Sequence, residues 1–207
     1  MNRALLATVS GVFVWSGFNP RDRFTWWLEV APVIIGLVLL ATTHRRFQFT
    51  PLAYVLMAIH AVILMIGGHY TYAEVPLFNW LRDALGLARN HYDRLGHFAQ
   101  GFVPAILARE ILLRCSPLRR GRWLFWLVFC VCMTISALYE LVEWRVAIAT
   151  GSAADAFLGT QGDPWDTQED LAMCLVGTIT ALLTLSGAHD RQLETRGHLP
   201  SSCEMTP

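Results

Sequence analysis

The amino-acid sequence predicts an all-α, polytopic membrane protein with about six transmembrane helices in one bundle. Two features of composition support this prediction: 54% of the 207 residues are hydrophobic and only 15% are charged, whereas soluble domains carry roughly 25% charged residues. The third observation is that the apolar residues gather in long runs, several of which reach the roughly 20 residues that a helix needs to cross a bilayer.

The formal net charge of the chain is zero, and all sixteen basic residues are arginine. A neutral chain lacks the excess of positive charge that binds phosphate backbones, so we expect no nucleic-acid partner. Cys130, Cys132 and Cys174 lie inside apolar runs, where cysteines do not form a disulfide framework. We therefore expect these three to be reduced and to pack between helices.

The first apolar run, residues 4–18, is short for a membrane span. Because it follows Met-Asn-Arg, it could instead be the core of a signal peptide. No small-x-small cleavage site follows it, and Phe18-Asn19-Pro20 is a poor one. We interpret the run as a retained first span.

Five further spans and one short interfacial helix follow in order. Trp26 and Trp27 open the second span and fit an interfacial aromatic belt. The predicted spans are residues 26–43, residues 50–65 with a continuation to 72, residues 92–114, residues 123–148 and residues 169–188, and the interfacial helix is within residues 78–87. We assign residues 1–190 to a single transmembrane domain and residues 191–207 to a polar, disordered cytoplasmic tail.

Arginine placement predicts the orientation, because cytoplasmic loops carry an excess of basic residues. One set of alternating connections holds Arg45, Arg46, Arg114, Arg119, Arg120 and Arg122, with Arg191 and Arg196 in the tail. The other set holds fewer arginines, and Asp22 partly offsets two of them. Both termini are therefore predicted to be cytoplasmic.

Residues 159–170 form an acidic stretch that carries four acidic residues and no base. Asp166 and Asp170 are four positions apart and share one face of a helix. Helix capping is an alternative explanation, because Asp163 before Pro164 suits an N-cap and Asp166 with Glu169 has capping-box spacing. Capping explains Asp170 least well.

The predicted topology brings further ionisable and polar residues to the same outer ends of the spans as this acidic stretch. Asp93 with His97, and Glu140 with Glu143, also have helical spacing. Crowded carboxylates in a medium of low dielectric constant repel each other, and either bound protons or a divalent cation relieves that repulsion. The residues that meet there are Glu29, His69, Tyr72, Asp93, His97, Glu140, Glu143, Asp166 and Asp170.

We assign roles on this basis. Asp93, His97, Asp166 and Asp170 are candidate metal ligands, and a set of carboxylates with imidazole suits Mg, Mn, Fe or Zn. Glu140 or Glu143 is a candidate ligand or general base. His69 is a candidate catalytic residue that, together with Tyr72, would position the substrate. Arg94 is a candidate phosphate-binding residue.

The same residues also have structural interpretations. His97 could be a hydrogen-bonded interior histidine, and Glu140 with Glu143 could form a salt bridge with Arg145 or Arg94. His60, in the middle of a span, is expected to pack between helices. The remaining expectations are that His44, His189 and His198 are solvated and that Arg109 with Glu110 is a snorkelling or local pair.

Four blocks of sequence resemble those of the YjdF-type inner-membrane proteins. They are residues 67–72 (GGHYTY), 91–98 (HYDRLGHF), 139–144 (YELVEW) and 158–170 (LGTQGDPWDTQED). The resemblance covers nearly the whole chain and implies a bacterial multi-pass inner-membrane protein, with no particular reaction. Asp93, His97 and Phe98 are also similar to a short motif of the VanZ-like proteins.

Three classes of function remain open from the sequence. One is a metal-dependent enzyme that acts on a lipid or lipid-linked molecule at the outer membrane surface. Another is an accessory or structural membrane protein whose polar cluster is salt-bridged. The third is a proton- or cation-coupled transporter, which the absence of an inverted repeat in the sequence disfavours. The sequence does not determine the oligomeric state.

Overall fold

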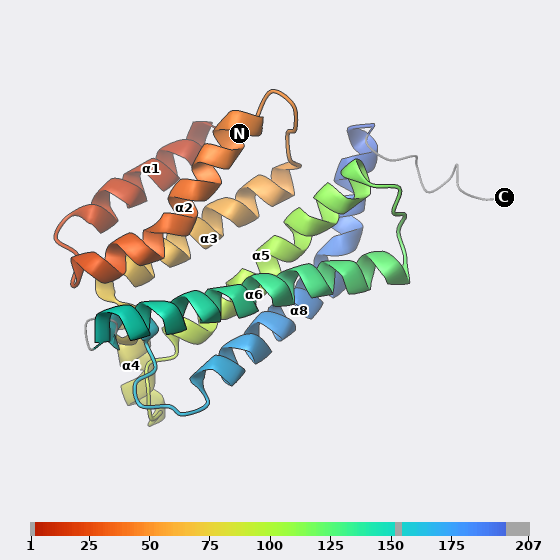
Figure 1. Ribbon diagram of the computed structural model, residues 1–207. Helices are drawn as coiled ribbons and strands as arrows, with labels where there is room; N and C mark the ends of the chain where they lie inside the picture. Colours follow the sequence, from red (N-terminus) through yellow and green to blue (C-terminus); the bar gives the residue numbers. More distant parts are fainter. Residues whose placement is uncertain (1–2, 152–154, 198–207) are drawn as a thin grey trace.

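The computed structural model describes residues 3–151 and 155–197, and within these residues the chain is helical, with no β-strand (Figure 1). The all-α prediction is therefore confirmed. In chain order the elements are α1 (Arg3–Gly17), α2 (Arg23–Thr43), α3 (Pro51–Tyr70), the 3-10 turn η1 (Tyr72–Glu74), α4 (Pro76–Leu85), α5 (Tyr92–Cys115), α6 (Arg122–Thr150), α7 (Asp155–Leu158) and α8 (Asp166–Thr195).

Four of these helices, α2, α3, α6 and α8, are long and apolar enough to cross a membrane by length and composition. α1 is apolar but has only 15 residues. α5 has 24 residues, yet it carries Asp93, Arg94, Arg109 and Glu110, so its composition differs from that of the other long helices. The structure thus supports a multi-pass helical membrane protein, with four apolar spans and two further helices of the predicted six.

α1 belongs to the bundle. Its Val9 packs in a buried cluster with Val30 and Met65, and its Ser16 hydroxyl accepts a hydrogen bond of 3.2 Å from the Trp26 indole. The predicted interfacial helix is α4, which has no buried residue and lies at one end of the bundle (Figure 1).

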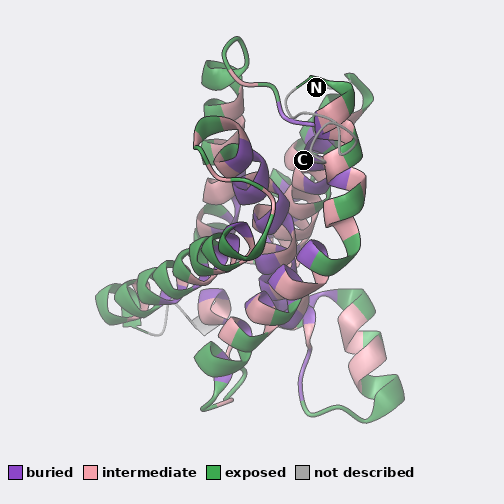
Figure 2. Ribbon diagram, turned by 90° about the vertical axis from the view of Figure 1, so that its right-hand side faces the viewer, coloured by how far each residue is buried: buried purple, intermediate pink, exposed green. Residues whose placement is uncertain are grey.

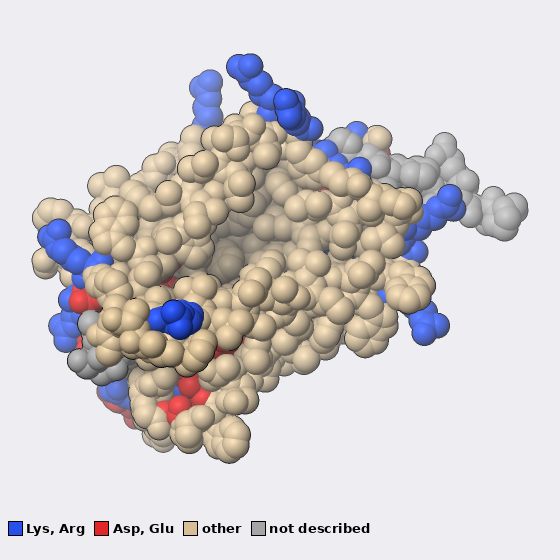
Figure 3. Space-filling model, viewed as in Figure 1, with Lys and Arg blue, Asp and Glu red and all other residues tan. Residues whose placement is uncertain are grey.

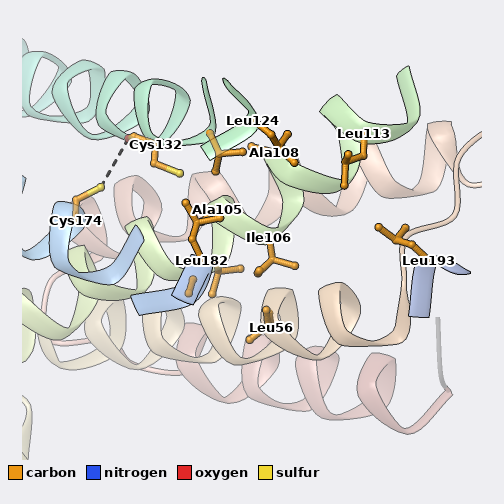
Figure 4. Close-up of a cluster of buried hydrophobic side chains, with 13 residues drawn as sticks. Leu56, Ala105, Ile106, Ala108, Leu113, Leu124, Cys132, Cys174, Leu182 and Leu193 are labelled. Atoms are coloured by element: carbon orange, nitrogen blue, oxygen red, sulfur yellow. Dashed lines mark hydrogen bonds between the residues drawn. The ribbon is translucent and has the colours of Figure 1, made fainter. Parts of the chain in front are cut away.

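α5 is the central helix and packs against α3, α6 and above all α8. Buried residues lie on the faces where the helices meet, and exposed residues lie on the outside (Figure 2). Figure 4 shows the core between α5, α6 and α8, to which Ile106, Cys132 and Cys174 contribute. Both cysteines are free thiols and pack as expected, whereas Cys130 is exposed on the outer face of α6.

Two glycines allow the close approach of α5 and α8. A Cβ atom on Gly101 would lie 2.0 Å from the carbonyl oxygen of Cys174, and one on Gly177 would lie 2.1 Å from that of Phe98. Small residues at such crossings let helix backbones touch, which is a common way for helices to pack in membranes.

Replacing Gly177 with alanine is expected to lower the free energy of unfolding by about 1–3 kcal/mol, the usual cost of overpacking a core. The added methyl group would meet backbone atoms of α5, which cannot move aside as a flexible side chain can. Unfolding in mixed micelles measures the effect. Gly187→Ala is the matched control in the same helix, because nothing lies within 4 Å of its Cβ position. Equal effects of the two variants on the free energy of unfolding would contradict the close approach of α5 and α8.

The end of the bundle formed by the α5 C-terminus holds a buried polar network that differs from the sequence expectation. Glu110 is fully buried and accepts hydrogen bonds from the Thr50 backbone N–H (3.0 Å) and from Arg114 (2.7 Å). His189 is also fully buried, accepts from Arg109 at Nδ1 (3.1 Å) and donates to Glu110 from Nε2 (3.0 Å). The expectation of a solvated His189 was therefore wrong. The expectation of a snorkelling or local Arg109–Glu110 pair was also wrong, because Glu110 bonds Thr50 before α3 and His189 of α8, while Arg109 pairs with His189 and Asp190 of α8.

The same network extends α8 beyond the predicted domain boundary at residue 190. Asp190 pairs with Arg109 at 2.7 Å, and Glu194 pairs with Arg120 at 2.8 Å. These tertiary contacts explain why the helix continues to Thr195. The first five residues of the predicted disordered tail, 191–195, are thus helical, and residues 198–207 lie outside the described residues.

Candidate functional site

The acidic loop between α7 and α8 turns sharply before α8 begins. Gly159, Gln161 and Gly162 all have positive φ angles, of 62°, 50° and 84°. α8 starts at Asp166, and its N-cap residue, Trp165, makes no side-chain capping bond. The N-cap and capping-box expectations for Asp163 and Asp166 were therefore wrong.

Asp163 instead stabilises the turn, where its Oδ1 accepts a hydrogen bond of 2.9 Å from the backbone N–H of Trp165. This bond, together with the nearby Arg89 and Arg94 guanidinium groups, lowers the pKa of the Asp163 carboxyl. Asp163 thus lies at the outer edge of the cluster as a carboxylate.

A pair of amide side chains holds this loop against the start of α5. Gln161 accepts a hydrogen bond from the Asn90 backbone N–H (3.0 Å) and donates one to the Asn90 carbonyl oxygen (2.8 Å). The Asn90 side chain donates to the Val75 carbonyl oxygen (3.1 Å) and accepts from the Tyr92 N–H (3.0 Å). The loop, the η1 segment and α5 are therefore fixed relative to one another.

Two buried arginines enter the acidic cluster beside this joint. Arg89 donates to Asp166 Oδ1 at 2.6 Å and to the Gly159 carbonyl oxygen at 2.9 Å. Arg94 donates to the same Asp166 oxygen at 2.9 Å, to Glu169 at 2.8 Å, and to Asp170. Asp166 is thus the common partner of two guanidinium groups, which explains its burial without a metal ion.

The sequence reasoning did not include Arg89 in the site. In the sequence, the signal for Arg89 was its position four residues before Asp93. In the structure, Arg89 Nη2 lies 3.7 Å from Asp93 Oδ2. Arg94, expected to bind a phosphate, has its guanidinium group occupied by carboxylates of the same chain.

Asp93, His97 and Asp170 form the set of residues whose ligand atoms converge. One ligand atom from each lies within 4.8 Å of the others. His97 Nε2 lies 3.6 Å from Asp93 Oδ1 and 3.7 Å from Asp170 Oδ2. All three side chains are at least nine-tenths buried, and they come from α5 and α8, the two helices in closest contact.

Gln100 determines which nitrogen of His97 faces the two carboxylates. His97 Nδ1 lies 3.0 Å from Gln100 Oε1, and since an amide oxygen only accepts, Nδ1 carries a proton. In the neutral ring Nε2 is then unprotonated and presents its lone pair to Asp93 and Asp170. Three electron-pair donors thus point at one another.

A partly open cavity of about 150 Å³ adjoins this trio, and further carboxylates line it. Asp93 and His97 line it together with Glu29 of α2, Tyr72 of η1, and Tyr139 and Glu143 of α6. Three buried polar atoms at the cavity and beside it have no hydrogen-bond partner among the described residues: Asp93 Oδ2, Glu140 Oε1 and the Tyr139 hydroxyl.

The alternative interpretation, in which Glu140 and Glu143 form a salt bridge with Arg145 or Arg94, is not found among the described residues. Arg145 is exposed and lies over the Trp144 ring, 5.8 Å from its centroid. The basic group nearest to Glu140 is His97, whose Nδ1 lies 3.8 Å from Glu140 Oε1. Both glutamates are buried, and no arginine in the described part of the chain forms an ion pair with either.

Tyr72 is held in the cavity by two glycines. A Cβ atom on Gly67 of α3 would lie 2.3 Å from the Tyr72 ring, and one on Gly96 of α5 would lie 2.8 Å from it. Burial, and after it the neighbouring Glu29 carboxylate, raises the pKa of the Tyr72 phenol well above its usual value. Tyr72 therefore remains a hydroxyl donor in this acidic surrounding.

Two histidines of α3 are placed differently from the sequence expectation. His69, a candidate catalytic residue, points toward α1: its Nδ1 lies 3.0 Å from the Ser16 carbonyl oxygen and its ring lies against Trp15, with centroids 4.5 Å apart. It does not line the cavity. His60, expected to serve only in packing, lines the cavity instead.

An apolar groove of about 230 Å³ lies next to this cavity, along α2, α3 and α5. The cavity and the groove share Pro32, His60 and Leu64. From there the groove reaches Leu40 and Leu107. Figure 3 shows a hollow in the uncharged middle of the molecule, while acidic atoms gather at the lower left.

Carboxylates outnumber arginines in the region as a whole. Two arginines, Arg89 and Arg94, lie among eight acidic residues, which are Glu29, Asp93, Glu140, Glu143, Asp163, Asp166, Glu169 and Asp170. A surplus of buried carboxylates is costly unless protons or a cation compensate it.

Fold and site together define a class: a helical membrane protein with a buried carboxylate–histidine cluster at one end of its bundle. The model of the family described as "Predicted membrane protein (DUF2238)" matches residues 1–191. The chain belongs to this family. It is 50% identical over 190 residues to the inner membrane protein YjdF of Escherichia coli (strain K12), with 92% of this chain and 91% of that protein covered. No solved structure matches it significantly.

Proposed function

We propose that this protein is a membrane-embedded, metal-dependent enzyme in which Asp93, His97 and Asp170 hold a divalent cation. The observation that carries the proposal is the convergence of two carboxylate oxygens on His97 Nε2, at 3.6 and 3.7 Å. Metal–ligand bonds of about 2.0–2.2 Å place neighbouring ligand atoms roughly 3.0–3.5 Å apart. A small contraction of the trio around a cation would bring it to that spacing.

The surroundings of the trio favour an oxygen-preferring cation. Two carboxylates and one imidazole suit Mg, Mn, Fe or Zn. Gln100 orients His97 from its second nitrogen, as outer-shell groups do at metal sites. Arg89 and Arg94 pair with Asp166 and Asp170, and both also lie within 3.7 Å of Asp93 Oδ2. The oxygens that face His97 Nε2 are therefore Asp93 Oδ1 and Asp170 Oδ2.

The cavity supplies the groups that a reaction would need. A cation at the trio would polarise a phosphoryl or carbonyl oxygen of a substrate placed beside it. Glu143 and Glu29 line the cavity and form no ion pair with a described basic residue, so each is a candidate general base. Glu140 lies beside His97 Nδ1, not beside the Nε2 that would bind the cation, and is likewise a candidate general base. The protonated Tyr72 hydroxyl would donate a hydrogen bond to the substrate.

The groove favours a lipid or lipid-linked substrate. It shares Pro32, His60 and Leu64 with the polar cavity and is lined mainly by aliphatic side chains of α2, α3 and α5. A molecule with a hydrocarbon chain in the groove would place its polar end beside Asp93 and His97. The hollow visible in Figure 3 offers entry from the side of the bundle.

We further propose six spans in a bacterial inner membrane, with both termini cytoplasmic. The curated relative from Escherichia coli is named an inner membrane protein, and α5 packs between α3, α6 and α8, which cover its charged groups. Reporter fusions after Pro20, Ala73 and Gly151 are expected to read as external. A cytoplasmic signal at Gly151 would contradict this orientation.

An accessory or structural role is the second candidate. Specific support comes from the buried arginine network, in which Arg89 and Arg94 neutralise part of the acidic loop without any ion. In that case the remaining carboxylates would carry protons, and the cavity would bind neither cation nor substrate.

Metal content separates the two candidates. Protein purified without chelator and equilibrated with Mg, Mn, Fe or Zn is expected to retain about one ion per chain. His97→Ala and Asp93→Asn are expected to lose it, because each removes one of three ligands. His69→Ala is the matched histidine control, since His69 contacts α1 instead. An ion-free wild-type protein, or full retention in His97→Ala, would exclude the proposed centre.

A further inference from the structure

A second charged region lies at the end of the bundle opposite the acidic cluster. It is an open pocket of about 390 Å³ lined by Arg45, Arg46, Gln48, Arg114 and Arg196. These residues come from the α2–α3 connection, the end of α5 and the residue after α8. We call this set the arginine pocket. Nothing in the proposed metal chemistry uses it.

The inner wall of the arginine pocket is held in place by contacts with the α2–α3 connection. Arg114 stacks on Phe47, with its guanidinium carbon 3.7 Å from the ring centroid, and donates to the Gln48 carbonyl oxygen at 2.7 Å. Arg196 donates to the Phe49 carbonyl oxygen at 2.8 Å. Both guanidinium groups therefore have fixed positions before any ligand arrives.

The rim of the pocket carries positive charge that the described part of the chain does not neutralise. Arg45 and Arg46 are exposed and form no ion pair with a described acidic residue. Glu110, the acid that pairs with Arg114, also accepts from Thr50 and His189. The pocket thus presents four guanidinium groups, of which one has a carboxylate partner, and it fits a phosphate-bearing anion.

The surface beside the pocket indicates the source of that phosphate. Val38 and Leu39, in the last two turns of α2, are each 57% exposed, and Ile35 below them is 59% exposed. Such side chains on a membrane span face hydrocarbon. A ligand that binds the pocket from this side would carry its acyl chains along α2 and its headgroup among the arginines.

We propose that the arginine pocket is a binding site for the headgroup of an anionic phospholipid. The apolar face of α2 places the acyl chains, Arg114 and Arg196 form the preorganised wall, and Arg45 with Arg46 closes over the phosphate. Basic pockets at the ends of membrane helices are suited to such headgroups. The bound lipid bridges the α2–α3 connection and the end of α8.

Thermal unfolding and lipid binding of the full-length protein in phosphatidylcholine nanodiscs, with and without phosphatidylglycerol, test this site. Phosphatidylglycerol is expected to raise the melting temperature of the wild-type protein by several degrees. Arg45→Gln/Arg46→Gln is expected to abolish that shift and to weaken phosphatidylglycerol binding about 30-fold, since each arginine near an anionic headgroup contributes roughly a factor of five. Both residues are exposed, so the variant retains the buried contacts of the fold.

Arg119→Gln/Arg122→Gln is the matched control, because it removes the same charge from exposed arginines at the same end of the bundle and outside the pocket. The rise in melting temperature that phosphatidylglycerol causes in this control, and its affinity for phosphatidylglycerol, should match those of the wild-type protein. If the two double variants lose the melting-temperature shift and the affinity to the same extent, the effect comes from general surface charge, and the proposal is overturned. An equal shift when inorganic phosphate is added to the phosphatidylcholine nanodiscs in place of phosphatidylglycerol would also overturn it.

Discussion

Replacing Arg94 with glutamine is expected to lower the free energy of unfolding by about 3–5 kcal/mol, the usual cost of removing one partner from a buried ion pair. The Arg94 side chain is 8% exposed and pairs with Asp166, Glu169 and Asp170. Glutamine fills similar space but leaves these carboxylates with less compensating charge in a medium of low dielectric constant. Unfolding in mixed micelles, followed by circular dichroism, measures the change.

Arg145→Gln is the matched control for this experiment. Arg145 is exposed and forms no ion pair with a described residue, so its loss should change stability by less than about 0.5 kcal/mol. Arg94→Gln/Asp170→Asn should recover part of the loss, because the double variant removes one charge of each sign. If Arg94→Gln and Arg145→Gln have the same effect, the buried arginine network does not hold the acidic loop.

Chelation of the bound cation is expected to lower the melting temperature of the wild-type protein by roughly 5–10 °C. A ligand present at a hundredfold excess over its Kd stabilises the native state by about 2.7 kcal/mol, and each kcal/mol corresponds to about 2–4 °C for a chain of this size. The physical reason is that removal of the cation leaves Asp93, Asp170 and Glu143 as crowded buried carboxylates. Differential scanning calorimetry with and without chelator measures the shift.

His97→Ala/Asp93→Asn provides the control for the chelator itself. This variant lacks two of the three ligand side chains, so its melting curve should not respond to chelator. His69→Ala should respond like the wild type. Identical melting curves of the wild-type protein with and without chelator, in protein shown beforehand to carry metal, would mean that the cation does not stabilise the fold. The arginine network would then account for the stability of the cluster, which would favour the accessory role.

The sequence by itself determined the helices and the end of the bundle at which most of the buried carboxylates gather. Long apolar runs have one stable form in a bilayer, because every backbone polar group must be bonded within the segment. Alternation of span direction then places the starts of α2, α5 and α8 beside the ends of α3 and α6. The sequence alone therefore groups six of the residues that meet there: Asp93, His97, Glu140, Glu143, Asp166 and Asp170.

Only the tertiary structure decided which of these groups meet. The rotation of each helix about its axis is set by packing, and sequence spacing within one helix does not reveal it. Thus the crossing at Gly101 and Gly177 brings Asp170 to His97, while the face of α3 that carries His69 turns toward α1.

The charge partners were likewise decided by tertiary contacts. Arg89 lies outside the spans, and it reaches Asp166 because Gln161 and Asn90 dock the acidic loop on the start of α5. His189 is buried because α8 continues beside Arg109 and Glu110. Coulomb interactions in the interior depend steeply on separation and on burial, and both quantities are properties of the packed bundle.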